Sequence, residues 1–147
     1  QHLLYVHSVP ELLGNFLLVG LLPAVGVELL FRGVLQQQLE KAVTNPHLAV
    51  WLTALIFSFI HFQFQGFFPR VLLGAGLGYL FVWTRNLWVP IIAHFVYNSG
   101  QVLLQYLHQQ QWVGLDLNSI DNVPFGLLVV SVGITSMLSY SLKMSGK

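Results

Sequence analysis

Long apolar runs that hold almost no charge dominate this chain of 147 residues. Hydrophobic residues make up 55% of the sequence, and Asp, Glu, Lys and Arg together only 7%, whereas about 25% of a typical soluble domain is charged. The runs lack the two-residue alternation of membrane barrel strands, and a bilayer offers no water to an open backbone, so they must be helices. The sequence therefore predicts an all-α, polytopic transmembrane helix bundle.

About five helices are expected, and together they form one domain that spans 1–147. We expect Pro23 to interrupt and kink the first helix just before Glu28, because proline lacks the backbone N–H that a helix needs. Gly74 and Gly78 form a small-xxx-small face on the third helix, which we interpret as close packing without chemistry. The expected helices cover residues 11–39, 46–62, 69–84, from between 85 and 90 to 108, and 123–142.

Several classes of protein are excluded or restricted by composition. The chain has no cysteine, which removes disulfides and thiolate chemistry. It has no basic run, so no nucleic-acid partner is expected and the lipid bilayer is the predicted environment. The sequence begins at Gln1 without a basic leader pattern, so we predict a fragment that lacks amino-terminal helices.

Basic residues are unevenly divided between the two predicted membrane faces. Lys41, Arg85, Lys143 and Lys147 fall on one face, and only Arg70 falls on the other. By the positive-inside rule the first face is cytoplasmic. We therefore expect an integral protein of the cell membrane with a cytoplasmic carboxyl terminus.

Five polar residues lie inside the apolar runs, where polar groups are costly and commonly functional. Glu28 and Arg32 are four apart on one helix face and can form an ion pair. His61 and His94 lie in two further helices, and Asn98 follows His94 by one turn. At 1.5 Å per residue their predicted depths overlap, roughly 6–22 Å from the cytoplasmic ends. Two interpretations stay open: a functional cluster, or a structural ion pair that fixes the bundle.

Three ordered motifs resemble the CPBP family, also called the Abi or type II CAAX prenyl endopeptidase family. They are Glu28-Leu29-Leu30-Phe31-Arg32-Gly33, Phe57-Ser58-Phe59-Ile60-His61 and His94-Phe95-Val96-Tyr97-Asn98. The resemblance implies a glutamate-dependent intramembrane endopeptidase. Its partner would be a hydrophobic or lipidated peptide or protein substrate at the membrane.

The resemblance also implies a role for each matched residue. The family motif begins with two adjacent glutamates, and the first, the expected general base, is replaced here by Val27. His61 matches the residue that orients the water, and His94 and Asn98 match the pair that stabilises the oxyanion. Glu28 and Arg32 match the supporting pair. A positioned base is worth about 10²–10⁴ in rate, so we predict that this chain is inactive.

Three alternatives remain beside this interpretation. His61, His94 and Glu28 could hold a catalytic zinc ion, but the zincin spacing is absent and we favour a mechanism without a cofactor. The chain could also be a non-enzymatic pseudoprotease, such as a bacteriocin-immunity-like membrane binding protein. A transporter or proton relay ranks last, because the sequence shows no inverted repeat.

Overall fold

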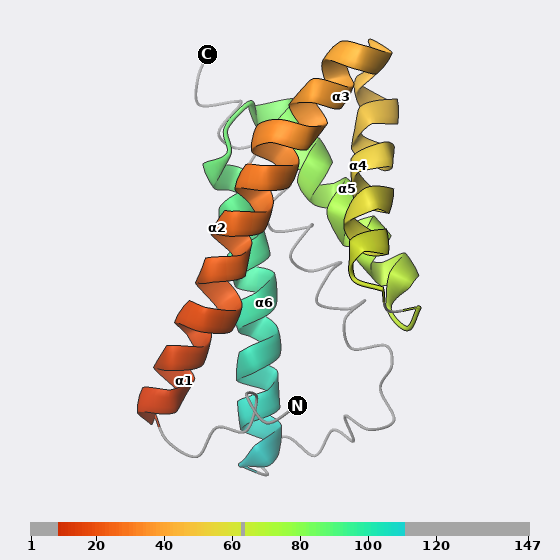
Figure 1. The fold of residues 1–147 in the computed structure, drawn as a ribbon. Coiled ribbons are helices and arrows are strands. Elements are labelled where there is room, and N and C mark those ends of the chain that lie inside the picture. The colour runs from red at the N-terminus through yellow and green to blue at the C-terminus, as the bar shows by residue number, and fades with distance from the viewer. Residues whose placement is uncertain (1–8, 63, 111–147) are drawn as a thin grey trace.

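Helices form all of the regular structure in the computed structural model, which describes residues 9–62 and 64–110 (Figure 1). Five consecutive segments make up one long helix, followed by three more helices in the described part of the chain. The segments of the long helix are α1 (Val9–Asn15), η2 (Phe16–Leu21), α2 (Leu22–Glu28), η3 (Leu29–Leu35) and α3 (Gln36–Val43), and the remaining helices are α4 (Pro46–Ile60), α5 (Phe67–Thr84) and α6 (Trp88–Gln109).

The all-α prediction is confirmed for the described residues. Four of the expected helices are present there, and the fifth, 123–142, lies outside them, so the count of about five is not confirmed. The long helix and α5 each have a stretch apolar enough to cross a membrane, at Pro10–Val43 and Phe67–Thr84. The third expected helix begins two residues earlier than predicted, at Phe67, which brings it to 18 residues.

The long helix continues through Pro23, where an interruption was expected. The change takes the form of a π-helical segment, η2, which ends two residues before the proline. Because Pro23 has no N–H, it cannot donate to the Val19 carbonyl four residues earlier. Asn98 Nδ2 from α6 donates to Val19 O instead, at 3.3 Å. The proline therefore opens a carbonyl that helps to attach α6.

Local capping sets the turn between α3 and α4. Thr44 ends α3 with a left-handed φ of 55°. The side chain of Asn45 then accepts hydrogen bonds from the backbone N–H groups of His47 and Leu48, and Pro46 occupies the first turn of α4. This short connection makes α3 and α4 antiparallel neighbours, as Figure 1 shows.

Glycines allow α5 to pack closely on its neighbours. A Cβ atom at Gly74 would lie 3.2 Å from the Cα and Cβ atoms of Ala54. One at Gly78 would lie 3.0 Å from Val50 Cγ1 and 3.0 Å from Gln36 Oε1. The predicted packing role of the two glycines is therefore confirmed.

The outer face of the long helix is apolar and exposed, as expected of a surface that meets lipid. Its exposed leucines are Leu13, Leu17, Leu18, Leu21, Leu22, Leu29 and Leu30. Near the other end of this helix, Arg85 Nη1 pairs with Glu40 Oε2 at 2.7 Å, which links the end of α5 to α3. Lys41 and Arg85 therefore lie at one end of the bundle, and Arg70, in the first turns of α5, lies toward the other.

Candidate active site

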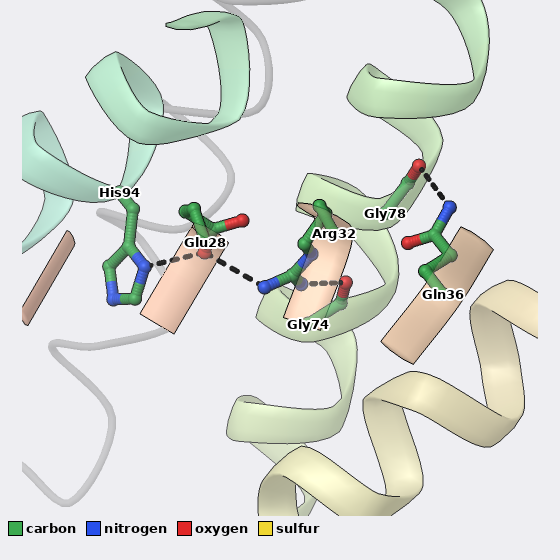
Figure 2. Close-up of polar contacts among 6 residues, drawn as sticks. All are labelled: Glu28, Arg32, Gln36, Gly74, Gly78 and His94. Carbon is green, nitrogen blue, oxygen red and sulfur yellow. Dashed lines mark hydrogen bonds and ion pairs between the residues drawn. The ribbon is translucent and has the colours of Figure 1, made fainter. Parts of the chain in front are cut away.

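Glu28 and Arg32 form a fully buried ion pair on the long helix. Arg32 Nη1 donates to Glu28 Oε1 at 2.8 Å, and both side chains are 0% exposed. Arg32 Nη2 donates to the Gly74 carbonyl on α5 at 2.7 Å (Figure 2). The guanidinium group also lies over the Phe57 ring of α4, 5.9 Å from its centroid. The pair predicted from the spacing therefore exists, and it joins three helices.

His94 brings α6 to the same carboxylate. Its Nδ1 lies 2.7 Å from Glu28 Oε1 (Figure 2). An ionised carboxylate only accepts, so Nδ1 carries the proton and donates. Glu28 Oε2 is buried and has no hydrogen-bond partner among the described residues. The Glu28 carboxylate thus orients the imidazole ring and leaves its Nε2 atom for the cavity described next.

A cavity of about 330 Å³ lies between α2, α4, α5 and α6. Four of the six predicted site residues line it: Val27, His61, His94 and Asn98. Glu28 and Arg32 are packed behind the wall and are not among the lining residues. The motifs from three helices therefore meet at one cavity, with the ion pair as its support.

Position 27 faces this cavity, and position 28 faces away from it. Val27 contributes to the lining, whereas the Glu28 side chain is directed to Arg32 and His94. Consecutive helical residues point about 100° apart. A π-helical segment follows Glu28 directly, yet it does not turn that carboxylate into the cavity. Glu28 is therefore not placed to replace a base at position 27.

His61 lies just beyond α4, one residue outside its last turn. Its Nδ1 is 2.7 Å from the Phe57 carbonyl, which can only accept, so Nδ1 is the protonated nitrogen. The Phe57 ring packs edge-on against both imidazoles, with centroids 4.9 Å from His61 and 6.5 Å from His94. This arrangement leaves Nε2 of His61 as a hydrogen-bond acceptor.

The zinc alternative is not assembled in this geometry. Within the described part of the chain, no group of three or more His, Cys, Asp or Glu residues is placed to hold a metal ion. Glu28 Oε1, one of the proposed ligand atoms, already accepts from both Arg32 and His94. The set His61, His94 and Glu28 therefore does not converge on one point.

Three site features were missed from the sequence. Gln36 is 0% exposed, and its Nε2 donates to Gly78 O and to Glu40 Oε1, each at 3.2 Å (Figure 2). Arg70 and Tyr97 line the cavity. The expectation that the third helix carries no chemistry is wrong in one respect, because α5 supplies Arg70 and the Gly74 carbonyl. Gln36 repeats the four-residue spacing of Glu28 and Arg32, and that signal could have found it.

The arrangement defines an α-helical membrane protein with a buried Glu–Arg–His cluster behind a cavity. The family described as type II CAAX prenyl endopeptidase Rce1-like matches residues 9–100, which is more than half of the chain. This chain belongs to that family, so the resemblance predicted from the three motifs is confirmed. The family and the apolar helices identify an integral membrane protein.

Two curated relatives come from Bacillus subtilis (strain 168). The chain is 34% identical over 89 residues to "Uncharacterized protein YpbD", covering 58% of this chain and 42% of the relative. It is 29% identical over 89 residues to "Putative membrane peptidase YdiL", covering 56% of this chain and 36% of the relative. The chain thus spans about two fifths of the length of these relatives. No solved structure matches it.

Proposed function

We propose that this chain is the scaffold of a glutamate-dependent intramembrane endopeptidase that is inactive because Val27 occupies the position of the base. Its substrate would be a hydrophobic or lipidated peptide or protein within the membrane. The observation that carries the proposal is the single cavity lined by Val27, His61, His94 and Asn98. The family supports the same chemistry, and the name of one relative is that of a membrane peptidase.

Hydrolysis of an amide needs a base for water and donors for the developing oxyanion. A glutamate at position 27 would enter the cavity lining beside His61. The His61 tautomer leaves Nε2 as an acceptor that can hold one proton of the water while the glutamate removes the other. His61 alone supplies no carboxylate base, so the valine leaves the attacking water without activation.

The opposite side of the cavity offers two donors. Asn98 Nδ2 uses one N–H on Val19 O, and its amide group carries a second N–H. His94 would donate from Nε2 when protonated, with Nδ1 held by Glu28. In this proposal Glu28 and Arg32 are positioning residues, because they act on the substrate only through His94.

The test is cleavage by the Val27→Glu variant, measured on a quenched fluorescent hydrophobic peptide in lipid nanodiscs. We expect about 10²–10⁴ times more cleavage than for the unaltered chain, as for a positioned base. Val25→Glu is the matched control, because Val25 belongs to the same helix but does not line the cavity. Equal activity in both glutamate variants, or none in the Val27→Glu variant, would overturn the proposal.

The same variant tests the role of metal. We expect cleavage by Val27→Glu to persist after treatment with a zinc chelator, because the proposed base and donors are all side chains. The measurement is the initial rate with and without chelator, followed by added zinc. Activity that is lost to the chelator and restored by zinc would show that the metal-independent mechanism is wrong.

A second function is favoured by the same valine. A cavity with its His, Asn and supporting ion pair in place but no base suits a membrane binding protein that holds a peptide without cleaving it. Equilibrium binding of hydrophobic peptides by the unaltered chain, combined with no cleavage by Val27→Glu, would support this pseudoprotease function over the protease.

A further inference from the structure

Arg70 lies at the rim of the cavity, one helical turn before Gly74 on α5. Of the described residues that line the cavity, it is the only Lys or Arg, and none is Asp or Glu. A guanidinium group at a partly apolar, membrane-embedded cavity attracts an anion more strongly than it would in water. The cavity therefore has a distinct chemical preference at this end.

The loop before α5 holds this guanidinium group in place. Arg70 Nη2 donates to the Gln65 carbonyl at 3.1 Å. Gly66 adopts a φ of +80°, and a Cβ atom there would lie 3.4 Å from Arg70 Nη1. A side chain at position 66 would be strained and close to the guanidinium group. The loop thus fixes the direction of Arg70, and a guanidinium with five N–H donors can hold a carbonyl and an anion together.

Polar side chains of α6 continue the rim opposite Arg70. Tyr97 and Gln101 both line the cavity, and their side chains are hydrogen-bonded to each other. Tyr97 also lies within electrostatic reach of Arg70. The phenol and amide groups can supply neutral hydrogen bonds beside the charged one.

The distance from the proposed reaction centre sets the position of the anion on a substrate. Gly74 O binds Arg32, whose partner Glu28 holds His94, so Gly74 marks the level of this cluster. Arg70 precedes it by four residues, about 6 Å along a helix, and its side chain points further out, toward Gln65. An extended peptide rises about 3.3–3.6 Å per residue. The anion would lie about two to four residues from the bond at His94.

We propose that Arg70, with Tyr97 and Gln101, is a carboxylate-recognition subsite that selects peptides with a carboxylate two to four residues from the scissile bond. The carboxylate can be a free carboxyl terminus or an acidic side chain, since both present the same paired oxygens to a guanidinium group. The inference rests on the proposed function for the peptide nature of the substrate.

The test is equilibrium binding to the full chain, unaltered at Val27 so that no turnover occurs, in nanodiscs of zwitterionic lipid. The probes are three versions of one fluorescent hydrophobic peptide: a free carboxyl terminus, an amidated terminus, and an amidated terminus with one glutamate near it. We expect the two carboxylate peptides to bind roughly tenfold more tightly than the amidated one, as for one charge-assisted hydrogen-bonded pair.

Arg70→Gln should remove this preference and leave the affinity for the amidated peptide unchanged. Arg70→Lys should keep part of it, because lysine supplies charge without the planar fork. Arg85→Gln is the matched control on the same helix, since Arg85 lies at the opposite end and pairs with Glu40. All variants are first compared for elution volume and thermal unfolding. A difference between the two carboxylate peptides would identify which source is recognised.

Equal affinity of the unaltered chain for all three peptides would overturn the inference. So would an Arg70→Gln variant that loses affinity equally for all three, which would mark Arg70 as structural. A preference that disappears when the nanodiscs contain anionic lipid would assign Arg70 to a lipid headgroup and also overturn it. The result is separable from the proposed function, because failed cleavage by Val27→Glu would leave carboxylate-selective binding intact.

Discussion

Neighbouring residues of the long helix have different environments in this molecule. Val27 lines the cavity, and Glu28 is buried behind it against Arg32 and His94. A single substitution at position 27 can therefore change the chemistry of the cavity while the ion pair behind it stays whole. A substitution at Glu28 or Arg32 would instead leave a charged group buried without its partner.

Arg32→Met should destabilise the protein by about 3–5 kcal/mol, the usual effect of removing one partner of a buried ion pair. The matched substitution is Arg85→Met, which breaks the ion pair with Glu40, where the side chains are 58% and 14% exposed. An exposed pair contributes about 0–1 kcal/mol. Equilibrium unfolding in mixed micelles measures both. Similar losses for the two variants would contradict the account of the Glu28–Arg32 pair.

At the scale of helices, sequence patterns predicted most of the described architecture. The Asn45–Pro46 pair marked the start of α4, and the boundaries of α5 and α6 lie within a few residues of those expected. The π segments were not predicted, because hydrophobic patterns are read at the ordinary α-helical period. Boundaries at His61 also differed by one or two residues, since the chain leaves α4 at Ile60.

The segment η3 explains why Gln36 was missed although Glu28 and Arg32 were found. In an ordinary α-helix, positions four apart drift by about 40° at each step, so Glu28 and Glu40 would differ by about 120°. The wider turns of a π segment counter this drift. Arg32 and Gln36 can therefore both reach α5, where they donate to Gly74 O and Gly78 O. Sequence spacing alone does not reveal this correction.

Gly78→Ala should destabilise the bundle by about 1–3 kcal/mol, because the added methyl group meets Val50 and the buried Gln36 amide at 3.0 Å. Gly26→Ala is the control within the long helix, since a Cβ there has nothing within 4 Å. That variant should be stabilised by about 0.4–1 kcal/mol through lower backbone entropy of the unfolded chain. Unfolding midpoints test both. A stable Gly78→Ala protein would show that close approach at this contact is unnecessary.

At the scale of the whole molecule, one end carries Lys41 and Arg85 and the opposite end of α5 carries Arg70. The cavity is lined by Gly66, Pro69 and Arg70 and therefore extends toward the Arg70 end. The positive-inside rule predicts that the Lys41 end is cytoplasmic. On that prediction the carboxylate-recognition subsite lies toward the exterior of the cell.

Labelling of single cysteines tests this orientation directly, because the natural chain contains no cysteine. Ala42→Cys and Gln65→Cys place one thiol at each end of the described bundle, both at exposed positions. We expect a membrane-impermeant maleimide to label the position 65 variant in intact cells and the position 42 variant only after lysis. The reverse pattern would invert the predicted topology.

The central claim is that the cavity is a hydrolytic site that lacks only its base at position 27. The most direct measurement compares single-turnover cleavage of one membrane-bound hydrophobic peptide by the Val27→Glu and Val27→Gln variants, which differ only in whether the group can take a proton. The account predicts cleavage by Val27→Glu and none above background by Val27→Gln. Equal rates for the two variants, or silence in both while each binds the peptide, would contradict it.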